Sequence, residues 1–186
     1  RKASSTVRTA ISNTTGKYLG WQEKPIHAVY HASNGGVMAS GAEAWSMAPV
    51  PYLRAQLDGS NDWIKRFVLP LKKNSDLRSL LEQVDGAYGN KHSRFRWTRT
   101  LNAADLKNSL DSFQDADILP SQVKVLKRGV SGRVLALEII GKYNQLRIVL
   151  KLDEIRRVLR DLPSTLFVVN ELKEGVWVFS GGGFGH

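Results

Sequence analysis

Cysteine is absent from this chain of 186 residues. Without thiols there is no disulfide framework, no cysteine-based zinc ribbon and no thiolate nucleophile. No stretch approaches the roughly 18 consecutive apolar residues of a membrane span, so we expect no transmembrane segment. The start of the chain also lacks the apolar core of a signal peptide, so we expect none in these residues. Because residue 1 is Arg1 and not Met, we expect a mature form or a fragment.

The composition is typical of a folded domain with an excess of basic residues. Hydrophobic residues make up 42% and charged residues 24% of the chain, so we do not expect disorder. The net charge is +10, of which +3 lies in residues 1–61, +2 in residues 62–117 and +5 in residues 118–186. A basic balance favours a polyanionic partner, whether nucleic acid, anionic lipid or an anionic cell-wall polymer. Charge alone does not choose among these three.

Strand and helix patterns follow one another without regular alternation. We expect strands within residues 7–31, a long irregular stretch over 32–62, and a helix over 74–84. Further segments share the period-2 pattern of strands: residues 63–69, 94–99, 122–127, 133–140, 146–150, 166–169 and 176–179. Residues 20–24 and residues 128–132 are expected to be hairpin connections. The order predicts an α+β fold, mainly an antiparallel β-sheet with a few short helices.

Two further helices begin at recognisable caps. Asn102 with Asp105 three residues later forms a capping-box pattern, and Asp153 begins a second helix that ends before Pro163. We expect one domain over residues 1–186, incomplete at both ends, with residues 62–117 as an inserted lobe.

A histidine followed by a glycine-rich turn is the first candidate site. The run includes His31, Ser33, Asn34, Gly35 and Gly36, and its two glycines allow positive φ and expose backbone N–H groups. Such a turn is suited to an oxygen-rich ligand. An ordinary turn that contains a histidine is the competing interpretation.

A tryptophan and a Tyr-x-Arg pair form the second candidate. The ring of Trp45 could stack on a sugar, while Tyr52 and Arg54 offer a hydroxyl and a planar fork for acetamido or carboxylate groups. A packed tryptophan and a strand begun by Pro51 would explain the same residues.

The glycine-rich run over 181–186 is the third candidate, with Gly183, Gly185 and His186 as its binding residues. It lacks the Lys-Ser/Thr of a phosphate-binding loop and does not open a helix. A basic and aromatic run over 91–99 suggests a nucleic-acid surface, but alternation explains it better, with Phe95 and Trp97 inside and the arginines in water.

Signals for catalysis or metal binding are sparse. The four histidines lack metal-ligand spacing, and there is no Gly-x-Ser-x-Gly elbow. Glu43 is the one carboxylate near the first motif that we consider for acid or base chemistry.

Seven segments in a fixed order resemble the stage II sporulation protein D (SpoIID) family, which includes LytB-type amidase enhancers. They are Val7–Gly16, Lys24–Ile26, Tyr30–Gly36, Trp45 with Pro51–Arg54, Ser131–Val134, Ile155–Phe167 and Gly181–His186. Two features depart from the family pattern: Ala32 stands where Ser is usual, and no position matches the catalytic Glu, which lies on a helix upstream of this region.

The resemblance implies an extracytoplasmic cell-envelope protein acting on peptidoglycan glycan strands. Sporulation members are lytic transglycosylases that cut between N-acetylmuramic acid and N-acetylglucosamine, preferring strands without peptide stems, and form 1,6-anhydro ends. The resemblance implies Tyr52 and Arg54 as catalytic residues, with the histidine–glycine turn, Trp45 and the terminal motif binding the glycan. The alternative is a non-catalytic peptidoglycan-binding or amidase-enhancing module, with a cell-wall amidase as partner. We expect no cofactor, no nucleic-acid partner and, without Cys, no metal site like that of some relatives.

Overall fold

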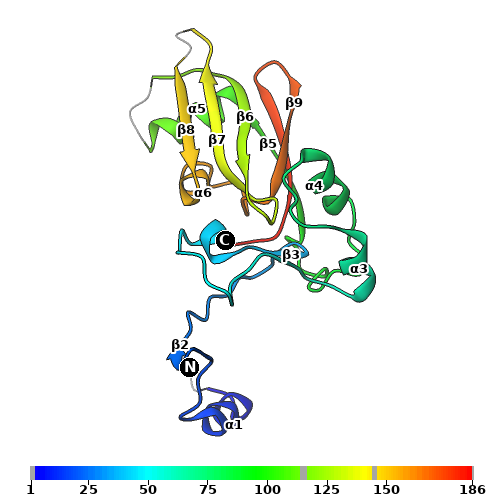
Figure 1. Ribbon diagram of the computed structural model, residues 1–186. Coiled ribbons are helices and arrows are strands. Elements are labelled where there is room, and N and C mark those ends of the chain that lie inside the picture. The colour runs from blue at the N-terminus through cyan, green and yellow to red at the C-terminus, as the bar shows by residue number, and fades with distance from the viewer. Residues whose placement is uncertain (1–2, 114–116, 144–145, 186) are drawn as a thin grey trace. The chain divides into compact units, whose positions relative to one another are not determined.

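The computed structural model describes residues 3–113, 117–143 and 146–185. By its internal contacts the chain divides into two compact units, Arg1–Tyr30 and His31–His186. Figure 1 shows the elements of each unit, which are described separately below.

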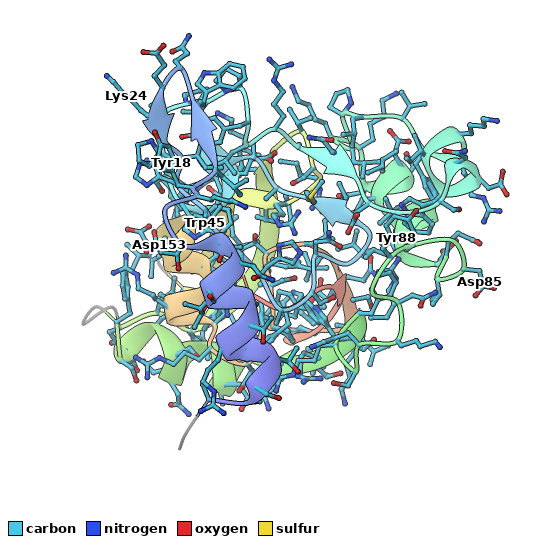
Figure 2. The ribbon with its side chains drawn as sticks, turned by 90° about the horizontal axis from the view of Figure 1, so that it is seen from below. Tyr18, Lys24, Trp45, Asp85, Tyr88 and Asp153 are labelled. Atoms are coloured by element: carbon cyan, nitrogen blue, oxygen red, sulfur yellow. The ribbon has the colours of Figure 1, made fainter. Side chains whose placement is uncertain are left out.

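The first unit is a helix followed by a small hairpin. Helix α1 (Ser5–Thr14) begins after Ser4, whose Oγ accepts a hydrogen bond from the Val7 N–H at 3.3 Å. Strands β1 (Gly20–Trp21) and β2 (Lys24–Pro25) pair antiparallel, and Lys24 is labelled in Figure 2. No residue of α1 is buried.

The strands expected within residues 7–31 are therefore wrong for 7–14 and for 26–31. The β-branched residues suggested a strand, but Val7 and Ile11 are four apart and share one helix face. The serine cap before them favours the helix. A hairpin does lie where residues 20–24 predicted one.

Two antiparallel three-stranded sheets form the body of the second unit. One has the order β5-β10-β9 and the other β6-β7-β8. Their bounds are β5 Arg96–Asn102, β6 Pro120–Arg128, β7 Val134–Gly141, β8 Arg147–Lys151, β9 Phe167–Lys173 and β10 Val176–Gly182. The α+β fold class is thus confirmed, as are the strands expected over 122–127, 133–140, 146–150, 166–169 and 176–179.

The larger core lies between these sheets and two helices. Helix α5 (Ala103–Asp111) begins at the expected capping box, with the Asp105 N–H donating to Asn102 Oδ1 at 2.9 Å. Helix α6 (Asp153–Val158) lies below β8 in Figure 1. Residues from both sheets and both helices bury their apolar side chains together, among them Leu106, Leu137, Ile155 and Phe179.

A smaller core lies under the short elements near the start of the second unit. Their bounds are β3 Val37–Met38, α2 Gly41–Ala44, β4 Gln56–Leu57, α3 Asn61–Arg66 and α4 Asn74–Leu81. This core contains Val37, Trp63, Leu77 and Leu166. It supports the turn that carries the first candidate motif.

Two expectations in this region need correction. Residues 63–69 were expected to form a strand, but α3 covers 61–66 because Ser60 caps it, accepting from the Trp63 N–H at 3.3 Å. Helix α4 ends at Leu81, short of the predicted residue 84, and Val84 is exposed. No helix in the described part of the chain is both long and apolar enough to cross a membrane.

Candidate functional site

The histidine–glycine turn and the terminal glycine motif lie against each other. Ser33 and Phe184 pair antiparallel: the Ser33 N–H donates to the Phe184 carbonyl at 3.2 Å, and the Phe184 N–H donates to the Ser33 carbonyl at 2.7 Å. We call this contact, formed by residues 33–36 and 182–185, the motif junction. The fold thus brings together two of the three candidate motifs.

Glycine is required on both sides of the junction. Gly35 and Gly183 both have positive φ, +72° and +84°. A Cβ on Gly183 would lie 2.7 Å from the Ser33 carbonyl oxygen, and a Cβ on Gly35 would lie 2.8 Å from the Gly182 carbonyl carbon. Side chains at these positions would force the two backbones apart.

Two arginines, the buried Arg133 and the half-buried Arg96, hold the turn in place. Arg133 donates to the carbonyls of Asn34 at 3.3 Å and Val37 at 3.1 Å, and Arg96 donates to the Gly35 carbonyl at 2.8 Å. Burial lowers the pKa of each guanidinium to about 10, so both remain charged at neutral pH. The prediction that Arg96 faces water is wrong. Carbonyls at the C-terminal end of α4, together with the Gly35 carbonyl of the turn, supply acceptors that solvent would otherwise provide.

Two indole rings support the junction as well. Trp63 Nε1 donates to the Gly36 carbonyl at 2.9 Å, and Trp97 Nε1 donates to the Gly183 carbonyl at 3.0 Å. Both rings are buried. The backbone of the junction is therefore positioned by side chains from α3 and β5, which makes it a rigid platform.

Polar side chains of the turn are connected to Asp58. Asn34 donates from Nδ2 to Asp58 Oδ2 at 2.5 Å, and its Oδ1 accepts from the Gly36 N–H at 2.8 Å. Burial, followed by the charge of Arg133, lowers the pKa of His31, while Asp58 acts in the opposite direction. The imidazole is therefore held toward its neutral form, in which one ring nitrogen accepts hydrogen bonds.

The side chains of Arg94 and His92 pack against the ring of Phe184. The Arg94 guanidinium carbon lies 4.2 Å from the centre of the Phe184 ring, and His92 stacks on the same residue at 6.5 Å between ring centres. Arg94 is exposed, as its strand pattern predicted. The Arg94 guanidinium therefore adds positive charge beside the junction.

Arg54 lines a groove to which no residue of the motif junction contributes. This groove of about 520 Å³ is also lined by residues 40, 42, 49–51, 53, 55 and 130. Tyr52 is half-buried and Arg54 is exposed. The Gly41 N–H donates to the Leu53 carbonyl at 3.0 Å, so this segment is held against α2.

Trp45, which is labelled in Figure 2, follows α2 as its C-cap residue and is half-buried. Its place at a helix end is compatible with both the stacking and the packing interpretation. His186 lies outside the described residues.

The Glu43 carboxylate accepts three hydrogen bonds from within the fold and has a structural role. Its Oε2 accepts from the Ser40 N–H at 2.8 Å and the Ser40 hydroxyl at 3.1 Å, and its Oε1 accepts from the Ser131 N–H at 3.0 Å. The residue is 8% exposed and its charge opposes the lowering of the Arg133 pKa. These bonds join α2 to the β6–β7 turn and leave the carboxylate poorly placed for acid chemistry.

Sequence reasoning missed several residues of the site. Arg133 was noticed only within a family motif, and Asp58, Arg96 and Phe184 carried no role of their own. A buried arginine cannot be distinguished from an exposed one by a period-2 pattern, because the pattern does not show which carbonyls are near. Among the described residues no group of three or more His, Cys, Asp or Glu lies close enough together to hold a metal.

A family model described as "Domain of unknown function (DUF8618)" matches residues 39–186. The chain belongs to this family. The match includes the groove, the β6–β7 turn and the terminal motif, but it begins after the histidine–glycine turn. A search of curated proteins finds no match.

Proposed function

We propose that this protein acts on the glycan strands of bacterial peptidoglycan, in the cell envelope, in the manner of SpoIID-like lytic transglycosylases. The observation that carries the proposal is the backbone pairing of Ser33 with Phe184. It unites two of the motifs on which the resemblance depends. If the two glycine-rich segments resembled the family only by chance, there would be no reason for them to contact each other in the fold.

The chemistry of the surface supports a sugar ligand. The exposed guanidinium groups of Arg54 and Arg94 can bind the carboxylates of a sugar chain. A muramic acid without its peptide stem carries a free carboxylate. Positively charged groups therefore suit strands from which the peptides have been removed.

Lytic cleavage requires a proton donor at the glycosidic oxygen. The donor, a carboxylic acid, protonates that oxygen as the C1–O bond breaks. The muramyl 6-hydroxyl attacks C1, and the carboxylate left on the donor then accepts the hydroxyl proton. No water is consumed, and the product is a 1,6-anhydro ring. In this proposal Tyr52 and Arg54 orient the glycan and stabilise charge near the leaving oxygen.

Digestion of purified, peptide-stripped peptidoglycan tests the proposal. We expect mass spectrometry to find 1,6-anhydro ends, and we expect Tyr52→Phe and Arg54→Ala to lower their yield while thermal stability stays unchanged. Lys127→Ala, a charge removal at an exposed position of β6, is the matched control. The proposal as a whole would be contradicted if the protein formed no anhydro ends and also failed to bind the insoluble wall.

A second candidate is a non-catalytic module that binds peptidoglycan or stimulates a cell-wall amidase. The engagement of both nearby carboxylates favours it, since Glu43 caps α2 and Asp58 accepts from Asn34. This candidate predicts co-sedimentation with insoluble wall, without anhydro ends, and faster release of peptide stems when an amidase is added. Anhydro ends formed by the purified chain would exclude it.

A further inference from the structure

A cleft of about 900 Å³ lies between α5 and α6, apart from the groove that contains Arg54. It is lined by Asn108, Ser109, Ser112, Phe113, Asp153, Arg156, Arg157, Val158, Arg160 and Asp161. Asp153 is labelled in Figure 2. Eight of these ten residues are polar or charged, which distinguishes this cleft from an apolar packing defect between two helices.

Three arginines within five residues of chain line this cleft, and a carboxylate pairs with only one of them. Arg157 Nε lies 3.1 Å from Asp153 Oδ2. No carboxylate among the described residues forms an ion pair with Arg156 or Arg160, although Arg160 Nε donates to the Arg157 carbonyl at 3.2 Å. Asp161 also lines the cleft, so its described lining residues carry one net positive charge.

Arg156 is the least satisfied of the three. It is partly buried, its Nε is shielded from solvent, and that N–H has no acceptor among the described residues. Burial lowers the pKa of its guanidinium. The Nη atoms of Arg156, unlike its Nε, are open to solvent and form no hydrogen bond with a described residue, so they are available to an anionic ligand in the cleft.

The other lining groups suit a sugar. Asn108 provides an amide, and the hydroxyls of Ser109 and Ser112 already donate to backbone carbonyls, which leaves their oxygens as acceptors. The Phe113 ring, 39% exposed, has the Arg157 guanidinium 5.8 Å from its centre. An aromatic surface beside hydrogen-bonding groups and guanidinium forks matches a carboxylated sugar ring.

The cleft is connected to the motif junction by a short segment. Arg160 lies three residues before Pro163, whose carbonyl accepts from the Gly185 N–H at 3.1 Å, and the next residue, Ser164, donates to the Gly182 carbonyl at 2.7 Å. Three residues of chain reach at most about 10 Å. A linear polymer bound at the junction could therefore extend into the cleft.

We infer that the α5–α6 cleft is a binding site for a carboxylate-bearing sugar chain, with Arg156 and Arg160 as its anion-binding residues. This inference deepens the proposed function, since it gives the same polymer a second contact. Nucleic acid is disfavoured because binding of single strands uses rows of stacking rings and strongly positive grooves. The described residues that line this cleft include one aromatic ring, which already lies beside Arg157, and they carry one net positive charge.

Binding of soluble sugar chains to the full chain tests the inference. The probe is a fluorescently labelled hyaluronan oligosaccharide, in which N-acetylglucosamine alternates with a carboxylated sugar. A chitin oligosaccharide of equal length, which lacks the carboxylate, is the neutral comparison. We expect hyaluronan to bind at least about tenfold more tightly than chitin, and the difference to shrink as salt is added.

Variants assign the binding to the cleft. We expect the double variant Arg156→Gln/Arg160→Gln to lose about tenfold in hyaluronan affinity and Arg160→Lys to lose less, because the charge remains without the fork. The double variant Lys124→Gln/Lys127→Gln removes the same charge from exposed positions of β6 and should bind as the wild type does. Thermal unfolding confirms that each variant is folded.

The outcomes separate this inference from the proposed function. Equal affinity of the cleft double variant and the wild type would overturn the inference. Tighter binding of polyphosphate or of single-stranded RNA than of hyaluronan, lost in the cleft variant, would overturn the carboxylated sugar as ligand. Peptidoglycan binding that depends on Arg54 but not on the cleft would leave the proposed function standing alone. Hyaluronan binding that depends on the cleft, without peptidoglycan binding, would support the inference and contradict the proposed function.

Discussion

Arg96, Arg128 and Arg133 differ from the three arginines of the α5–α6 cleft in what their guanidinium groups bind. Arg128 and Arg133 are buried and Arg96 is half-buried, and all three donate mainly to backbone carbonyls, as Arg128 does to Gly132 and Phe167 at 2.8 Å each. The cleft arginines reach one carboxylate and one carbonyl among the described residues. Buried arginines here position loops, whereas the cleft arginines remain available to a ligand.

Removal of a buried arginine should produce the largest effect on stability. We expect Arg133→Met to lower the free energy of unfolding by about 3 kcal/mol, because it leaves two carbonyls unpaired and the buried Glu43 without its compensating charge. Urea unfolding followed by tryptophan fluorescence measures the change. A loss below about 1 kcal/mol would mean that water satisfies these carbonyls and that the turn does not depend on Arg133.

The junction that these arginines support should be nearly as sensitive. We expect Gly183→Ala to lower the free energy of unfolding by about 2 to 3 kcal/mol, since it combines positive φ with a Cβ 2.7 Å from the Ser33 carbonyl oxygen. Gly89→Ala is the control, with φ +68° and nothing within 4 Å of its Cβ. Equal losses in the two variants, measured by urea unfolding, would show that backbone strain alone matters and that the close approach does not.

Variants of the cleft should scarcely change stability. We expect Arg160→Gln to alter the free energy of unfolding by less than about 0.5 kcal/mol, because its side chain is exposed and makes no ion pair with a described residue. The same urea experiment as for Arg133→Met gives the comparison directly. A large loss here would place Arg160 with the structural arginines and weaken its assignment to a ligand.

The smallest effect should come from His31. Its pKa in the folded protein is below the ordinary value of 6.5, so the unfolded chain binds a proton more readily. The contribution of His31 to stability is therefore present above pH 6.5 and decreases as the pH falls below that value toward the lowered pKa. Urea midpoints from about pH 7.5 down to about pH 5.5 should fall less steeply in His31→Gln than in the wild type. Identical slopes would show that the imidazole is not desolvated beside Arg133.

Local signals in the sequence predicted much of the second unit. The capping box of Asn102 and Asp105 and the glycine-containing turn between β6 and β7 act over a few residues, and both lie where expected. Residues 7–14 and 63–66 were mistaken for strands because their β-branched and aromatic residues outweighed the serine caps at Ser4 and Ser60. In these two segments the hydrogen bonds of the helix cap outweigh strand propensity, and the periodicity of residue types gives no information about such bonds.

The candidate site was predicted in its parts but not in its arrangement. The turn at 31–36 and the motif at 181–186 were both selected, and the fold joins them. Tyr52 and Arg54 were grouped with them by resemblance, yet Arg54 lines a separate groove beside α2. Asp58 and Arg133 were not assigned to the site, because their roles depend on contacts with Asn34 from distant segments.

The sequence by itself determined the α+β class, the helix beginning at Asn102, the β6–β7 hairpin and the need for glycine at the two motifs. Each follows from interactions among residues close in the chain or from the conformational freedom of single residues. Only the tertiary structure decided that Arg96 donates to the Gly35 carbonyl, that Ser33 pairs with Phe184 and that three arginines line one cleft. These outcomes depend on which carbonyls, strands and helices the topology brings together, and no short-range pattern encodes that meeting.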